Sequence, residues 1–86
     1  MNDAPWPSRL SPGALATFEQ LPAHAREMLR DMMGLARRDP WSFPPFDPHD
    51  PEGEDVRSAS VGLLSTVYWI NRPAARLYVI AIVWLG

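Results

Sequence analysis

Two apolar runs near the C-terminus decide the fold of this chain: VGLLSTVYWI at residues 61–70 and LYVIAIVWL at residues 77–85. Val, Ile, Tyr and Trp suit the pleated surface of a sheet, and the linking stretch NRPAAR contains Asn and Pro, which are typical of turns. The pattern predicts a β-hairpin. The second run lacks the alternation of apolar and polar residues that a hairpin with one face in water shows. We therefore expect both faces of this strand to be covered, partly by another protein.

The composition is that of one small domain with a core of marginal size, since the chain has 86 residues and 47% of them are hydrophobic. There is no cysteine, which excludes disulfides and thiolate metal sites and suits a reducing compartment. The run at 77–85 is shorter than the roughly 20 residues that span a bilayer. The first residues lack the basic and then apolar pattern of a signal peptide. We expect a soluble cytoplasmic protein that does not contact the membrane and needs no cofactor.

The charges are distributed unevenly, although the formal net charge is only −2. Residues 47–55 contain five acidic residues and no basic one, and residues 56–86 contain three arginines and no acidic residue. This predicts a basic hairpin that follows an acidic loop. Opposite charges attract over about a Debye length of ~8 Å at physiological salt. We therefore expect the loop to shade the basic face and to weaken non-specific binding of nucleic acid.

The N-terminal half predicts a short strand and two helices. Residues 6–10 form an extended segment that Pro5 and Pro7 restrict to the edge of a sheet. Ser11 and Pro12 are a typical helix start, and Pro22 breaks the helical pattern and begins a second helix that runs to about residue 38. The two helices have almost no loop between them and are expected to form an α-hairpin.

A proline-rich acidic loop and a further strand precede the hairpin. Residues 39–55 contain five prolines, which preclude regular structure, and we expect their aromatic residues to pin the first half of the loop to the helices. Residues 56–61 read VRSASV, alternate between apolar and polar, and predict a strand. Residues 1–86 are therefore expected to be one α+β domain, with a short N-terminal strand, an α-hairpin and a three-stranded antiparallel sheet.

This order of elements resembles the RelE/ParE superfamily of bacterial toxins. The resemblance is carried by four stretches: RLSPGALA at 9–16, LPAHAREML at 21–29, RRDPW at 37–41 and VYWINRPAARLYVIAIVW at 67–84. It implies the toxin of a type II toxin–antitoxin pair, silenced by a cognate antitoxin protein. Ribosome-dependent members of the superfamily cleave mRNA in the ribosomal A site, so the resemblance also implies the ribosome and its mRNA as partners and an endoribonuclease activity.

The residues leave two alternatives to the nuclease function open. RelE-like nucleases commonly have a basic residue two places before the Val-Tyr pair, where this chain has Ser65, and they continue past the last strand with a basic turn and a catalytic aromatic residue, whereas this sequence stops at Gly86. These departures favour a non-catalytic interaction module with the same fold. A gyrase-poisoning toxin similar to ParE, which acts by binding, is the other alternative.

The candidate site residues are mostly arginines. Arg57 matches a basic position of the family and is the candidate catalytic residue, because a guanidinium binds phosphate oxygens in a bidentate manner. Arg57, Arg72 and Arg76 are the candidate RNA-phosphate contacts, although solvated or ion-paired arginines are the commoner outcome. Alternate residues of the last strand are candidates for the partner-binding surface: Tyr78, Ile80, Ile82 and Trp84.

We expect no metal site. His49 lies among carboxylates, which suit divalent cations, but the spacing of these residues follows a proline-rich loop and not an EF-hand pattern.

Overall fold

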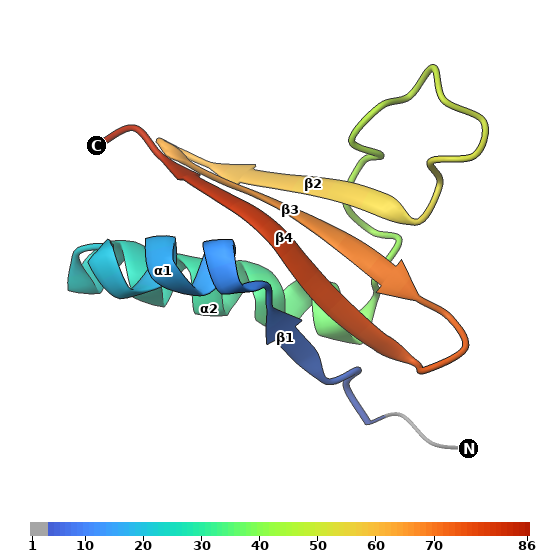
Figure 1. The fold of residues 1–86 in the computed structure, drawn as a ribbon, viewed down its shortest axis with the longest axis horizontal. Coiled ribbons are helices and arrows are strands. Elements are labelled where there is room, and N and C mark those ends of the chain that lie inside the picture. Colours follow the sequence, from blue (N-terminus) through green and yellow to red (C-terminus); the bar gives the residue numbers. More distant parts are fainter. Residues whose placement is uncertain (1–3) are drawn as a thin grey trace.

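The computed structural model describes residues 4–86, which form an α-hairpin and a four-stranded sheet (Figure 1). The elements in chain order are β1 (Ser8–Leu10), α1 (Pro12–Gln20), α2 (Ala23–Arg38), β2 (Val56–Val61), β3 (Leu64–Asn71) and β4 (Arg76–Trp84). Both helices lie on one side of the sheet, and the loop of residues 39–55 projects beyond β2. The α+β fold predicted from the sequence is confirmed, and so is the order of its elements.

The sheet has the strand order β1-β4-β3-β2. Strands β2, β3 and β4 are antiparallel, as expected, while β1 pairs with β4 in parallel and joins the same sheet as an edge strand. The N–H of Leu77 donates to the carbonyl of Pro7 at 2.9 Å. Proline has no N–H to donate, so the edge is where this segment fits.

The helices begin at the residues that the sequence indicates. The Ser11 hydroxyl accepts a hydrogen bond of 3.1 Å from the N–H of Ala14, and Pro12 follows in the first turn of α1. Pro22 precedes α2 and prevents one continuous helix. None of the helices among residues 4–86 is long and apolar enough to cross a membrane.

The core lies between α2 and one face of the sheet. The apolar side of α2 is buried, and it consists of Ala25, Leu29, Met32 and Ala36, with Met33 beside it. On the sheet, side chains of β3 and β4 that face the helices are also buried, namely Leu64, Thr66, Tyr68, Ile70, Leu77, Val79 and Ile82. We call this side of the sheet the helix face and the opposite side the outer face. No helix covers the outer face.

The first of the two apolar runs is interrupted by a turn that we did not predict. Strand β2 ends at Val61, and residues 62–63 form the turn that leads into β3. Gly62 has a φ of 57°, in the left-handed region that glycine adopts without strain. The sequence therefore forms two consecutive hairpins, where we expected one hairpin preceded by a strand.

A β-bulge in β4 changes which side chains share a face. Tyr68 pairs with Val79 and Val67 pairs with Ala81, so that Ile80 has no partner on β3. The Ser11 hydroxyl donates to the carbonyl of Ile80 at 3.1 Å, which links the bulge to the start of α1. Because one extra residue reverses the alternation, Tyr78 lies on the outer face while Ile82 is buried on the helix face.

The loop of residues 39–55 lies against the edge strand β2. The N–H of Phe46 donates to the carbonyl of Val56 at 2.9 Å, and the N–H of Ser58 donates to the carbonyl of Pro44 at 3.0 Å. Pro45 thereby forms an isolated bridge with Arg57. The predicted contact of the loop with the core is present for Trp41 and Phe43, whereas Phe46 is exposed.

Candidate functional site

The base of the loop meets the second hairpin at Arg72. The Nη2 atom of Arg72 lies 2.8 Å from a carboxylate oxygen of Glu54 and 2.8 Å from one of Asp55, and its Nε atom lies 2.9 and 3.0 Å from the two carboxylate oxygens of Asp55. The guanidinium also stands over the Trp41 ring, 4.9 Å from its centroid. Trp41 in turn donates from Nε1 to Asp55 at 3.2 Å. These four side chains form a connected group, which we call the Arg72 clamp.

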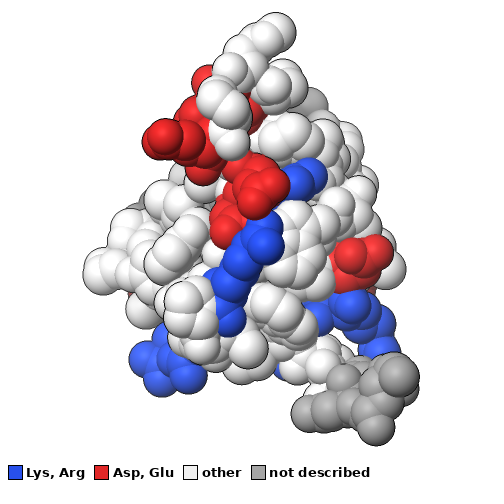
Figure 2. All heavy atoms as spheres, turned by 90° about the vertical axis from the view of Figure 1, so that its right-hand side faces the viewer, with Lys and Arg blue, Asp and Glu red and all other residues white. Residues whose placement is uncertain are grey.

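The clamp lies where the acidic and basic parts of the surface meet. Figure 2 shows acidic side chains gathered over the loop and a basic side chain directly beside the lowest of them. The hydrogen bond from Arg72 lowers the pKa of Asp55, and its charge and the Trp41 N–H act in the same direction, against the effect of burial. The same hydrogen bond raises the pKa of Arg72. Both groups are therefore charged at neutral pH.

Arg57, the candidate catalytic residue, is bound to the backbone of the loop. Its Nε donates to the carbonyl of Glu54 at 2.8 Å, and its Nη1 donates to the carbonyl of Phe43 at 3.1 Å. Arg57 pairs in the sheet with Tyr68 and so lies on the helix face. Two of its donors are occupied by carbonyls that hold the loop in place.

Arg76 lies on the other side of the sheet. It pairs with Asn71 across the turn of the second hairpin, on the outer face, and its Nε is buried without a hydrogen-bond partner among residues 4–86. The structure therefore brings Arg57 and Arg72 together at the base of the loop and places Arg76 on the opposite face of the sheet from Arg57. The three predicted phosphate contacts do not form one cluster.

Tyr68 is the buried aromatic residue nearest to this region. Its hydroxyl donates to the carbonyl of Pro40 at 2.7 Å, and its ring meets Phe43 edge-on at 6.5 Å between centroids. Burial raises the pKa of Tyr68 to about 12, with a smaller opposing effect of the Arg57 charge. At neutral pH this hydroxyl is protonated and already engaged, so its role is structural.

The histidines do not join the site. The His24 ring packs edge-on against Trp84, 5.4 Å between centroids, and His49 lies in the exposed loop, where its N–H donates to Asp47. Within residues 4–86, no group of three or more His, Cys, Asp or Glu side chains is placed to hold a metal ion.

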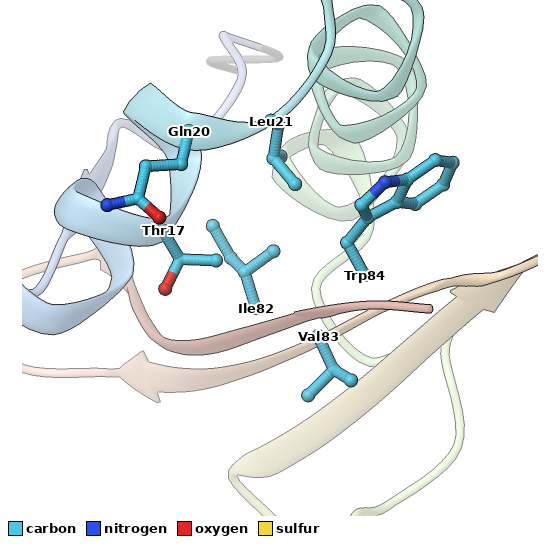
Figure 3. A pocket seen from close by; sticks show the side chains of 6 residues that line it. All are labelled: Thr17, Gln20, Leu21, Ile82, Val83 and Trp84. Atoms are coloured by element: carbon cyan, nitrogen blue, oxygen red, sulfur yellow. The ribbon is translucent and has the colours of Figure 1, made fainter. Parts of the chain in front are cut away.

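The four residues predicted to bind a partner lie on two different surfaces. Tyr78 is on the outer face, and Ile80 is the exposed residue of the bulge. Ile82 and Trp84 line a groove of about 360 Å³ beside α1 and point toward the helices, whereas Val83 points to the opposite side of β4 (Figure 3). The predicted single surface is therefore divided by the bulge. Whether these residues bind a partner stays a prediction.

Comparison with solved structures shows which fold this is. The crystal structure of the isolated RelE toxin of E. coli superimposes with a TM-score of 0.80 at 16% identity, over 94% of this chain and 85% of that chain. A chain of the RelBE2 toxin–antitoxin complex from Mycobacterium tuberculosis gives a TM-score of 0.76 at 18% identity, over 94% of this chain and 99% of that chain. The chain has the RelE fold.

An archaeal structure also matches this chain. A chain of the archaeal RelE–RelB complex from Pyrococcus horikoshii gives a TM-score of 0.72 at 11% identity, over 96% of this chain and 98% of that chain. No protein-family model and no curated relative matches the sequence. The likeness thus lies in the arrangement of the elements, and the fold that the sequence resemblance implied is confirmed.

Three members of the Arg72 clamp were not identified as site residues from the sequence. Trp41 was expected only to pin the loop, and Glu54 and Asp55 were two of five similar acids. One feature of the sequence could have indicated them: Glu54 and Asp55 directly precede the basic strand β2. The sequence does not indicate that the contact would be made to Arg72, which follows 17 residues after Asp55.

Proposed function

We propose that this chain is the toxin component of a type II toxin–antitoxin pair and acts in the cytoplasm. The observation that carries the proposal is the RelE fold, which extends over 94% of the chain. The solved structures that match include RelE toxins, and among them are complexes of a toxin with its antitoxin. The other half of the proposed pair is an antitoxin protein that binds this chain and silences it.

The outer face of the sheet supports a protein partner. Trp69 is 41% exposed and Val83 is 50% exposed, although both belong to the strands that form the centre of the sheet. Tyr78 lies directly beside Trp69 on the same face, and the pair Val67 and Ala81 lies between them and Val83. A contiguous exposed apolar surface favours association. We propose that the antitoxin covers this face and the adjoining bulge at Ile80.

Expression in a bacterial host tests the proposal. Induction of this chain alone is expected to arrest growth, and co-expression with the antitoxin, sought in the adjacent reading frame, is expected to restore growth and to yield a complex that co-purifies. Absence of growth arrest would overturn the proposed toxicity, and rescue without a complex would overturn the proposed mode of silencing.

Two exposed apolar residues provide a matched pair for the partner surface. Val83→Glu places a charge on the outer face, and Leu35→Glu places the same charge on α2, where Leu35 is 62% exposed. If the antitoxin covers the outer face, Val83→Glu weakens co-purification at least about tenfold, because an unpaired charge is costly to bury, and Leu35→Glu leaves it unchanged. Equal effects of the two substitutions would contradict the assigned surface.

We consider two modes of action of the toxin on its cellular target. The first is ribosome-dependent cleavage of mRNA, with Arg57 gripping a phosphate. The second is binding without cleavage. It is favoured because Arg57 already donates hydrogen bonds to two backbone carbonyls and the Tyr68 hydroxyl donates to the carbonyl of Pro40. Arg57→Ala separates them once growth arrest is established. Loss of arrest with retained antitoxin binding supports cleavage, and unchanged arrest supports action by binding alone.

A further inference from the structure

The Arg72 clamp resembles a phosphate-binding position that is already occupied. A guanidinium presents a planar set of donors that suits carboxylate and phosphate groups alike. Here the Trp41 ring fixes one side of the guanidinium, and the two donating nitrogens Nε and Nη2 both point at carboxylate oxygens of Glu54 and Asp55. The two carboxylates stand where the oxygens of a phosphodiester would bind.

The contact is open enough to be displaced. The Arg72 side chain is 51% exposed, and those of Glu54 and Asp55 are 66% and 25% exposed. Exposed ion pairs contribute little to stability and weaken as salt increases. A ligand with several phosphates can therefore compete with the loop for this arginine. Arg72 directly follows Asn71, which pairs with Arg76 on the outer face, so the other phosphates of the ligand can bind around the turn on that face.

The neighbouring strands offer such further contacts for a single-stranded nucleic acid. Arg9, Tyr78 and Trp69 lie in one row across the outer face of β1, β4 and β3. The strands within residues 4–86 contain no Asp or Glu. Aromatic rings stack with bases, and adjacent guanidinium groups bind the phosphates between them. Stacking distinguishes a nucleic acid from an acidic polypeptide, which offers charge alone.

We propose that Arg72, held over Trp41, is a phosphate-binding position for single-stranded RNA and that Glu54 and Asp55 occupy it in the free protein as an autoinhibitory contact. The proposal rests on the proposed function for the choice of RNA, and it adds a regulation that is built into the loop. Binding of RNA displaces the two carboxylates from Arg72, and loss of the RNA lets them return.

The test compares two variants with the same change in charge. Glu54→Gln/Asp55→Asn neutralises the clamp, and Asp47→Asn/Glu52→Gln neutralises two acids of the same loop that make no contact with an arginine. Affinity for a fluorescent 15-residue oligouridine probe is measured by anisotropy at several salt concentrations. The clamp variant is expected to bind about fivefold more tightly than the unmodified protein at low salt, with a salt slope steeper by about 0.7, which corresponds to one more phosphate contact.

The control outcomes separate the clamp from general electrostatics. The Asp47/Glu52 variant is expected to gain less than about twofold, and addition of Arg72→Ala to the clamp variant is expected to abolish the gain. Equal gains in the two variants, a gain that survives Arg72→Ala, or no RNA binding by the clamp variant would each overturn the proposal. An equal gain for polyglutamate would overturn the assignment to nucleic acid.

The fold is checked on the same samples by circular dichroism and thermal unfolding. If the double variant does not fold, Glu54→Gln alone removes the more exposed carboxylate and is expected to give a smaller gain of about twofold. These binding measurements need neither toxicity nor the antitoxin. The RNA-binding assay therefore tests the proposal about the Arg72 clamp, while the growth assay tests the proposed function separately.

Discussion

The hydroxyl of Tyr68 donates a hydrogen bond of 2.7 Å to the carbonyl of Pro40, which lies 28 residues earlier in the chain. Tyr68 is fully buried at the centre of β3, and Pro40 is the second residue after α2, which ends at Arg38. The Phe43 ring packs edge-on against the same tyrosine. This contact therefore fixes the point where the loop leaves the helix and, with it, the position from which the loop reaches Arg72.

Substitution of Tyr68 by Phe tests this anchor. The change leaves the buried carbonyl of Pro40 without a donor, and the free energy of unfolding is expected to fall by about 1–3 kcal/mol. Urea denaturation measures the loss. Tyr78→Phe is the control, because the Tyr78 hydroxyl makes no hydrogen bond within residues 4–86. A loss of similar size in the control would show that the Pro40 contact is not the cause.

Stability at alkaline pH provides a second test of Tyr68. Its pKa is about 12 in the folded protein, against 10.0 for an ordinary tyrosine, so the folded state holds the proton more tightly than the unfolded state. The stabilisation is complete below pH 10 and is lost as the pH rises toward 12. We expect the stability difference between the unmodified protein and Tyr68→Phe to shrink over this interval in urea titrations. A constant difference would contradict the raised pKa.

Stability at acid pH tests the Arg72 clamp. Asp55 has a folded-state pKa below the ordinary 3.8, so its contribution is present above that value and is lost as the pH falls through the lower folded pKa. We expect Asp55→Asn to unfold at a lower temperature than the unmodified protein at about pH 6. The two melting temperatures are expected to converge as the pH falls below the ordinary value of 3.8. Asp47→Asn, in the same loop, is the control, because the amide oxygen of Asn can still accept the hydrogen bond from the His49 N–H, and it is expected to leave the melting temperature at about pH 6 unchanged.

Two glycines are expected to respond in opposite directions to alanine. Gly62 has a φ of 57°, so Gly62→Ala strains the turn and lowers the free energy of unfolding by about 1–2 kcal/mol. Gly34 lies inside α2, and an added methyl group there would meet no atom within 4 Å. Gly34→Ala is therefore expected to add about 0.5–1 kcal/mol, because alanine favours helix. Urea denaturation of the two variants compares them directly, and a loss of stability in both would contradict the prediction for α2.

Much of the fold is local in origin and could be predicted. Ser11 with Pro12 marks the start of α1, Pro22 separates the helices, and the spacing from Ala25 to Ala36 identifies the buried side of α2. These features depend on residues within a few positions of one another. Local propensities and periodicity therefore describe them well.

The features that could not be predicted depend on pairing between distant residues. The bulge at Ile80 arises from the match of β4 to β3 and from the Ser11 hydroxyl, so the sequence of β4 alone suggests one surface where the structure has two. The turn at Gly62 lies inside an apolar run that reads as continuous strand. The clamp joins Trp41, Asp55 and Arg72 from three segments, and only the opposite charges of the loop and hairpin indicated it.

The backbone bonds of the loop to β2 also affect how this chain behaves among its own copies. An open edge strand is a template to which further strands can add, and stacked additions produce fibrils. In this fold the carbonyl of Val56 and the N–H of Ser58 are already satisfied by residues 44–46. Pro44 and Pro45 lack the N–H groups that another strand would need. The proline-rich loop thereby caps half of the sheet edge against polymerisation, which protects a small protein whose hairpin is rich in aggregation-prone sequence.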